Sequence, residues 1–282
     1  MIRLAATASI AALLLAACTP APADTPAAED AAVAAASAEP AEPEDFQLSY
    51  ILETENYTVQ SEIDPAILAF DPPLAWRLWT QAKAQLDDLG QSADEGRSMA
   101  DADTAASGED SWFRGYSLEI THKVTGVFDD IISVSDFVGT DTGGAHPNYF
   151  LAGAIHRKGE TEPLALSTFI TDEVAFNGLV IKALVEEKLA RGYTDDRAVI
   201  EAGLRELLVP PTDVPEAYQG SFVFEPSTEP GKIGGITVMF SPYDIGAYAE
   251  GSYEVTLPAS ELTPILTEAW LPRFGGDPVV KE

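Results

Sequence analysis

Basic residues are scarce in this chain. Its 282 residues include 16 Lys and Arg against 46 Asp and Glu, which gives a formal net charge of -30. Nucleic-acid binding needs a dense basic surface, and an anionic membrane surface repels a chain of this charge. The composition therefore argues against nucleic acid as a partner. A hydrophobic content of 46% still requires that part of the chain buries a core.

Cysteine is almost absent, because Cys18 is the only one. A single cysteine cannot close an intramolecular disulfide, and no second thiolate exists for a Cys-based zinc site. An apolar run, Leu4–Ala17, follows Arg3 and directly precedes Cys18. This run is too short to span a bilayer and is typical of a secretory signal. The Leu-Ala-Ala-Cys sequence at 15–18 resembles a bacterial lipoprotein box. We expect a signal peptide at residues 1–17 and a lipid on Cys18 that anchors the chain to the membrane.

The segment after the anchor has no basic residue. Residues 19–45 contain eleven Ala, five Pro and seven acids. We predict that residues 18–45 form a lipid-anchored, disordered linker, since they offer almost nothing to bury. Thr19, in place of Asp, resembles lipoproteins of the Gram-negative outer membrane. The expected location is the cell envelope, facing the periplasm or the exterior, with the outer membrane favoured if the host is Gram-negative.

From Phe46 onward, apolar residues follow strand and helix periods. The pattern predicts a helix that begins at Pro72 and stops at Gly90, an acidic loop at 91–110, and a last helix near Ser260–Trp270. Further helices are predicted at 172–190 and from Arg197, and strands at 57–63, 116–120, 124–128, 131–138, 149–155, 222–224, 236–240 and 253–257. This order favours the α+β class with antiparallel sheets and packed helices. We predict two small domains, 46–153 and 154–272, and a tail at 273–282.

Known catalytic and metal-binding patterns are missing. The three histidines, His122, His146 and His156, lack the spacing of a helical zinc motif, and Gly-x-Ser-x-Gly is absent. Asp141-Thr142-Gly143 is a single copy, whereas an aspartic protease pairs two carboxylates. Asp101-Ala102-Asp103 begins like an EF-hand loop but continues without its Gly and Glu. We expect no metal site and no cofactor, and we interpret 91–110 as a solvated acidic loop, with weak calcium binding as the alternative.

Two segments supply the candidate site residues. In the stretch from Gly143 to Phe150, the glycines permit a tight turn, while a histidine and an asparagine can hydrogen-bond to the loop or to a ligand. In the stretch from Pro242 to Gly251, tyrosines offer amphipathic rings that either pack or bind. The binding candidates are Gly143, Gly144, His146, Asn148, Tyr149, Tyr243, Asp244 and Tyr248. A structural role for each of them is the alternative interpretation.

These same segments carry a family resemblance. Gly-Gly-Ala-His-Pro-Asn at 143–148 resembles the end of the extracellular domain found in the peptidoglycan deacetylase PdaC and the anti-sigma factor RsiV. Residues 218–224, 240–251 and 255–258 resemble the RsiV-type domain that usually follows. The resemblance implies an extracytoplasmic α+β protein. RsiV binds lysozyme through this portion, so the resemblance implies a lysozyme-like partner. The deacetylase activity of PdaC and the sigma-factor binding of RsiV belong to other segments, which have no counterpart in this sequence, so neither is implied.

Three functional hypotheses follow. The first is a non-catalytic, lipid-anchored envelope protein that binds a peptidoglycan-type glycan or a basic lysozyme-like protein, which an acidic surface would attract. The second is a hydrolase of unrecognised type that uses His146 and Asp141 as acid and base. The third is a purely structural envelope lipoprotein, for which neither binding nor turnover is expected.

Overall fold

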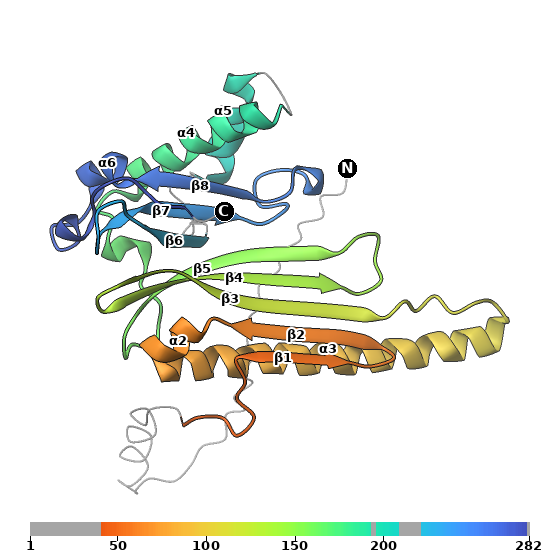
Figure 1. The fold of residues 1–282 in the computed structure, drawn as a ribbon. Coiled ribbons are helices and arrows are strands. Elements are labelled where there is room, and N and C mark those ends of the chain that lie inside the picture. The colour runs from red at the N-terminus through yellow and green to blue at the C-terminus, as the bar shows by residue number, and fades with distance from the viewer. Residues whose placement is uncertain (1–40, 193–195, 209–220, 281–282) are drawn as a thin grey trace, which may run out of the picture. The chain divides into compact units, whose positions relative to one another are not determined.

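Two β-sheets and their helices make up the computed structural model, which describes residues 41–192, 196–208 and 221–280 (Figure 1). The signal peptide, Cys18 and most of the linker lie outside these residues. The strands are β1 (Ser49–Glu53), β2 (Tyr57–Ile63), β3 (Tyr116–Phe128), β4 (Ile131–Asp141), β5 (Asn148–Arg157), β6 (Ser221–Pro226), β7 (Ile233–Phe240) and β8 (Tyr253–Pro258). The helices are α2 (Pro65–Phe70), α3 (Pro72–Ser107), α4 (Glu173–Arg191), α5 (Arg197–Leu208) and α6 (Ala259–Leu262). Short 3-10 turns lie at Leu166–Thr168, Tyr248–Glu250, Thr263–Ile265 and Leu271–Arg273.

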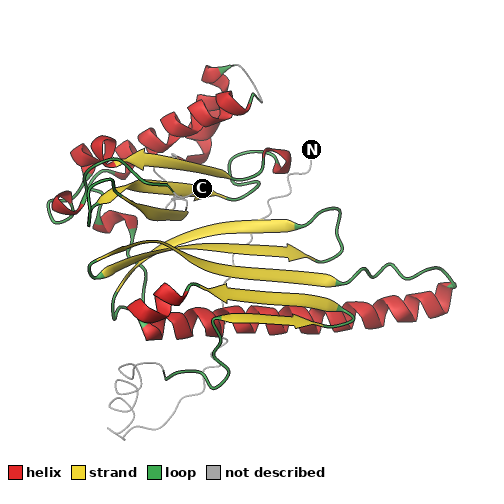
Figure 2. Ribbon diagram, in the orientation of Figure 1, coloured by secondary structure: helices red, strands yellow, loops and turns green. Residues whose placement is uncertain are grey.

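The larger sheet has the order β1-β2-β3-β4-β5, and the smaller one has the order β6-β7-β8. Figure 2 shows the two sheets with helices beside them, which confirms the α+β class. The sequence predicted antiparallel sheets, but the larger sheet is mixed, because β2 and β3 run parallel. The chain between them folds into α2 and α3, and a helical crossover of this kind is what a parallel pair requires.

The helix α3 corrects the expectation of an acidic loop at 91–110. It continues past Gly90 to Ser107 and ends at Gly108, whose φ of 73° is a left-handed helix cap. Small buried residues continue its inner face beyond Gly90, at Ala93, Gly96 and Ala100. A Cβ atom at Gly90 would lie 2.9 Å from Cζ of Tyr57, so the glycine makes room for this ring instead of ending the helix.

Three further expectations differ from the structure. The predicted strands at 116–120 and 124–128 are one strand, β3, with a bulge between Val124 and Gly126. The predicted helix at Ser260–Trp270 is only the four-residue α6 followed by 3-10 turns, since Pro264 has no N–H to continue it. The predicted tail pairs with the smaller sheet, where Val279 N donates to Pro226 O at 2.8 Å.

The core continues from one sheet to the other. One face of the larger sheet packs on α3 through Val59, Leu86 and Ile120. On the opposite face, Ile131 and Ile155 join the core of the smaller sheet and α4. The predicted domain boundary between residues 153 and 154 falls inside β5, and it stays a prediction.

Within the described parts of the chain, no helix is long and apolar enough to cross a membrane.

Candidate functional site

The two motif segments, about a hundred residues apart in sequence, meet in space. The ring of His146, from the loop between β4 and β5, stacks on the ring of Tyr248 with a centroid distance of 3.8 Å and an angle of 18°. The carbonyl of Pro147 accepts hydrogen bonds from the hydroxyl of Tyr248 and from Nδ1 of His146. The hydroxyl of Tyr149 accepts from Ser252 N at 3.1 Å. These contacts, which we call the loop contact, join the edge of the larger sheet to the loop between β7 and β8.

Tyr243 stands at the tip of the second segment. Asp244 N donates to Ser241 O at 3.1 Å, and Ser241 N donates to Oδ2 of Asp244 at 2.7 Å, so the four residues from 241 to 244 close a turn. Tyr243 adopts a φ of 76° at the third position of this turn, a conformation that favours glycine. The side chain of Tyr243 is 63% exposed, and the centroid of its ring lies 5.4 Å from that of Tyr248.

The same loop is also held by a partly buried ion pair with α4. The carboxylate of Glu250 accepts from Nζ of Lys188 at 2.5 Å and from the hydroxyl of Tyr253 at 2.6 Å. Burial acts to raise the pKa of Glu250, but the hydrogen bonds from Lys188 and Tyr253 outweigh it and lower the pKa below its usual value. Glu250 is therefore ionised at neutral pH and holds the 248–250 turn against α4.

The residues of the hydrolase hypothesis are each engaged in their own loop. Oδ1 of Asp141 accepts from Gly143 N at 2.8 Å, and Gly143 has the φ of 75° that such a turn needs. Nδ1 of His146 is bonded to Pro147 O, and the ring lies flat on Tyr248. Gly144 has open space around it. This geometry explains the motif by turn formation, and the catalytic role of His146 with Asp141 stays a prediction.

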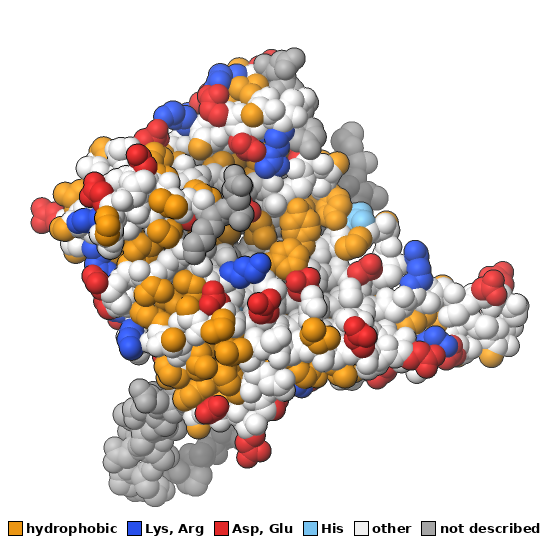
Figure 3. All heavy atoms as spheres, viewed as in Figure 1, with side chains coloured by type: hydrophobic (Ala, Val, Ile, Leu, Met, Phe, Trp, Pro, Cys, Tyr) orange, Lys and Arg blue, Asp and Glu red, His pale blue; other side chains and the backbone are white. Residues whose placement is uncertain are grey.

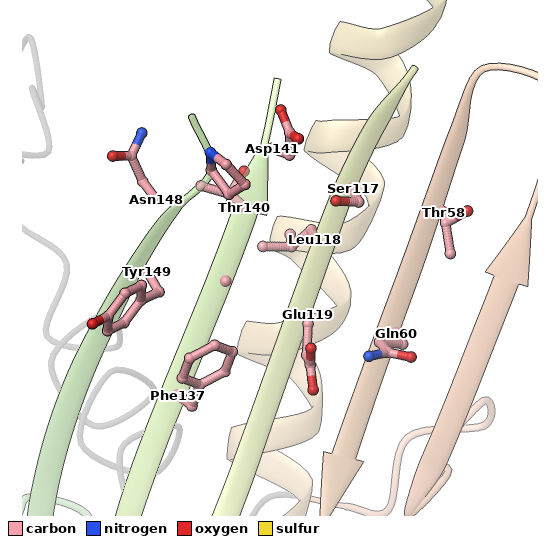
Figure 4. Close-up of a pocket in the computed structure, with 12 residues that line it drawn as sticks. Thr58, Gln60, Ser117, Leu118, Glu119, Phe137, Thr140, Asp141, Asn148 and Tyr149 are labelled. Atoms are coloured by element: carbon pink, nitrogen blue, oxygen red, sulfur yellow. The ribbon is translucent and has the colours of Figure 1, made fainter. Parts of the chain in front are cut away.

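An open groove lies beside the loop contact, on the face of the larger sheet opposite α3 (Figure 4). Alternate residues of β2, β3, β4 and β5 point to this face, as the pleat of a sheet dictates. The first lobe of the groove has a volume of about 340 Å³. It is lined by Thr58, Gln60, Ser117, Leu118, Glu119, Phe137, Gly139, Thr140, Asp141, Pro147, Asn148 and Tyr149. We call the whole feature the sheet-face groove.

An aromatic pair forms the centre of this lobe. The rings of Phe137 and Tyr149 are nearly parallel, with a centroid distance of 5.9 Å. Phe137 lies over Gly139: a Cβ atom at position 139 would stand 2.9 Å from Cε1 and 3.0 Å from Cζ of the ring. The missing side chain at 139 therefore lets the ring lie across the sheet. Gln60 and Glu119 place an amide and a carboxylate group around it.

A second lobe of about 360 Å³ continues the sheet-face groove along the same strands. Glu119 and Phe137 line both lobes, and Met239 and Glu254 of the smaller sheet close the far end. The ionisable residues that line the two lobes are the acids Glu119, Asp136, Asp141 and Glu254 and the base Lys123. Figure 3 shows acidic side chains spread over this side of the molecule and a group of hydrophobic ones beside the visible histidine.

Only some of the residues that line the sheet-face groove could be identified from the sequence. Asn148 and Tyr149 were binding candidates and line the sheet-face groove, as does Asp141. Gln60, Glu119 and Phe137 were missed, although they sit at alternate positions of strands that the sequence did predict. Knowing the strand order would have identified them. Among the described residues, no group of three or more His, Cys, Asp or Glu side chains could hold a metal ion.

Comparison with known proteins finds a family model that matches the second motif. Residues 209–260 match the model of DUF3298, a protein family of unknown function, which confirms the RsiV/PdaC-type resemblance for this part of the chain. A crystal structure of a DUF3298 member from Bacteroides fragilis has 18% sequence identity and a TM-score of 0.51, with 79% of this chain and 92% of that chain covered.

A second DUF3298 structure, from Pseudomonas aeruginosa, has 14% identity and a TM-score of 0.44, with 84% of this chain and 99% of that chain covered. At these identities the likeness to the Bacteroides fragilis structure concerns the fold alone. No curated protein matches the chain.

Proposed function

We propose that this chain, which carries a DUF3298 segment, is a non-catalytic binding module of the cell envelope and that the sheet-face groove is its ligand-binding surface. The observation that carries the proposal is the pairing of an aromatic floor, Phe137 and Tyr149, with a rim of amides, hydroxyls and carboxylates in an open groove. Binding sites of this kind combine apolar contact with a few polar groups that fix orientation.

The first candidate ligand is a glycan of the peptidoglycan type. A sugar ring has an apolar face that stacks on an aromatic side chain and hydroxyl groups that pair with Gln60, Ser117 and Glu119. The second candidate is a basic protein of the lysozyme type, which the family resemblance suggests. Its support on the surface is the excess of acids over bases that line the sheet-face groove, since complementary charge speeds association and favours a cationic partner.

Binding of both ligands to the full-length chain tests the proposal. Soluble peptidoglycan fragments and lysozyme are titrated at about 0.05 and 0.5 M NaCl. The Debye length, over which charges are screened, differs several-fold between these two concentrations. A glycan contact made by stacking should persist at high salt, whereas an electrostatic contact with lysozyme should weaken strongly. A double variant, Glu119→Gln with Asp141→Asn, should reduce lysozyme binding. If neither ligand binds under either condition, the proposed function is wrong.

Attachment to the membrane is a separate part of the proposal. We infer that Cys18 carries the anchor and that residues 18–45 hold the folded part at a distance from the envelope membrane, facing the periplasm or the exterior. Replacing Cys18 by Ala should move the full-length chain from the membrane fraction to the soluble fraction. A variant that stays with the membrane contradicts the anchor and leaves the binding surface untouched.

A further inference from the structure

The sheet-face groove runs along the strands and does not end at one pocket. Its first lobe reaches Asp141 at one end of β4, and its second lobe reaches Ser135 on the same strand. Six residues of strand separate these positions, a length of about 20 Å. Phe137 lies between them and lines both lobes. An occupant that fills the whole groove is therefore an extended chain, and the ring of Phe137 lies where the two lobes meet.

We infer that the sheet-face groove binds a linear oligosaccharide laid along β3 and β4, with one sugar ring stacked on Phe137. This inference rests on the proposed function and specifies its ligand as a chain of several sugars, bound through an internal segment. The polar groups are placed on both sides of the ring: Gln60 and Ser117 in the first lobe, and Thr121 and Ser135 in the second. Glu119 lines both lobes and can accept from hydroxyl groups of neighbouring sugars.

The support for Phe137 is built into the sheet. Gly139 allows the ring to lie across the strand, because a Cβ atom there would stand within 3.0 Å of two ring carbons. Tyr149 packs against the ring from β5, and the hydroxyl of Tyr149 is held by Ser252 N at 3.1 Å. The stacking surface is thus positioned in advance, which lowers the entropic cost of binding a flexible glycan.

The experiment uses the full-length chain and N-acetylglucosamine oligomers of two and four units, with calorimetry at about 0.5 M NaCl to screen charge contacts. We expect the tetramer to bind about ten-fold more tightly than the dimer, since only the tetramer reaches both lobes. Phe137→Ala should weaken the tetramer about ten-fold, because ring stacking contributes on that scale. Phe137→Tyr should bind like the unchanged chain.

Gly139→Ala gives a second variant in case Phe137→Ala disturbs folding. The added methyl group displaces the ring from its place and should also weaken the tetramer, while Phe137 itself remains. Phe150→Ala is the matched control. Phe150 is 54% exposed, lies on β5 opposite Val138, and points to the other face of the same sheet. This control should leave tetramer binding unchanged.

The outcomes separate the inference from the proposed function. Tetramer binding that Phe137→Ala and Gly139→Ala leave unchanged overturns the stacking site. Equal affinity for the dimer and the tetramer overturns the extended ligand. Lysozyme binding without any oligosaccharide binding overturns the glycan inference but keeps the proposed function with its protein ligand, and no binding of either ligand overturns both.

Discussion

At the scale of single residues, Tyr243 is the clearest conflict between local preference and structure. Its φ of 76° is a conformation that glycine adopts freely and a tyrosine adopts at a cost of about 1 kcal/mol or more. With a side chain 63% exposed, the ring recovers little of this cost by burial. Strain of this kind is often retained at binding surfaces.

Tyr243→Gly is therefore expected to stabilise the protein, by about 0.5–1 kcal/mol in the free energy of unfolding. Urea unfolding of the full-length chain measures this difference. Ala247→Gly is the control, because Ala247 has an ordinary φ of -73° in the same loop and should gain nothing from the change. A loss of stability in Tyr243→Gly would show instead that contact with Tyr248 holds the turn together.

The candidate residues show how far sequence reasoning reached. The glycines, His146 and Tyr248 were recognised because turn-forming glycines stood beside a histidine and tyrosines in short segments, and the structure gives most of them turn and stacking contacts. Phe137 escaped notice because an aromatic residue in a strand is ordinary. Its role depends on Gly139 beneath it and on Tyr149 from the next strand, and a single sequence does not state which strands are neighbours.

At the scale of elements, most strands and the helices α4 and α5 could be predicted because their apolar periods are strong. The error at α3 has a specific cause. Glycine commonly ends a helix, and the residues after Gly90 are small and acidic, which is also typical of a loop. In the structure the small residues are the packing face, since Tyr57 and Tyr116 fill the space above Gly90 and Gly96. Sequence alone does not distinguish these two uses of small residues.

Two glycines in the middle of helices give a paired test of this explanation. Glycine costs about 1 kcal/mol relative to alanine in a helix, so Gly178→Ala in α4, where nothing lies within 4 Å, should raise the free energy of unfolding by about that amount. Gly90→Ala should gain nothing or lose stability, because its methyl group would meet the ring of Tyr57 at 2.9 Å. Equal gains in both variants, measured by urea unfolding, would contradict the packing role of Gly90.

At the scale of the whole molecule, the question is whether the two sheets unfold together. The sequence suggested two domains divided after residue 153, while the structure joins the sheets through buried polar contacts. Oγ of Ser133, on the larger sheet, accepts from Phe224 N of the smaller sheet at 2.8 Å. Oγ1 of Thr125 lies 2.9 Å from Phe224 O. Such contacts, within a continuous apolar core, favour one cooperative unit.

Ser133→Ala tests this cooperativity, because it leaves the N–H of Phe224 buried without its acceptor at a cost of about 1–3 kcal/mol. Two tryptophans report separately: Trp79 is buried beneath the larger sheet and Trp270 in the core of the smaller one. In variants that keep only one of these two tryptophans, Ser133→Ala should lower both unfolding midpoints equally.

The control is Ser135→Ala, two residues along the same strand in the lining of the open groove. It should change the free energy of unfolding by less than about 0.5 kcal/mol. A midpoint that falls for Trp270 while that of Trp79 is unchanged would show that the two sheets unfold independently.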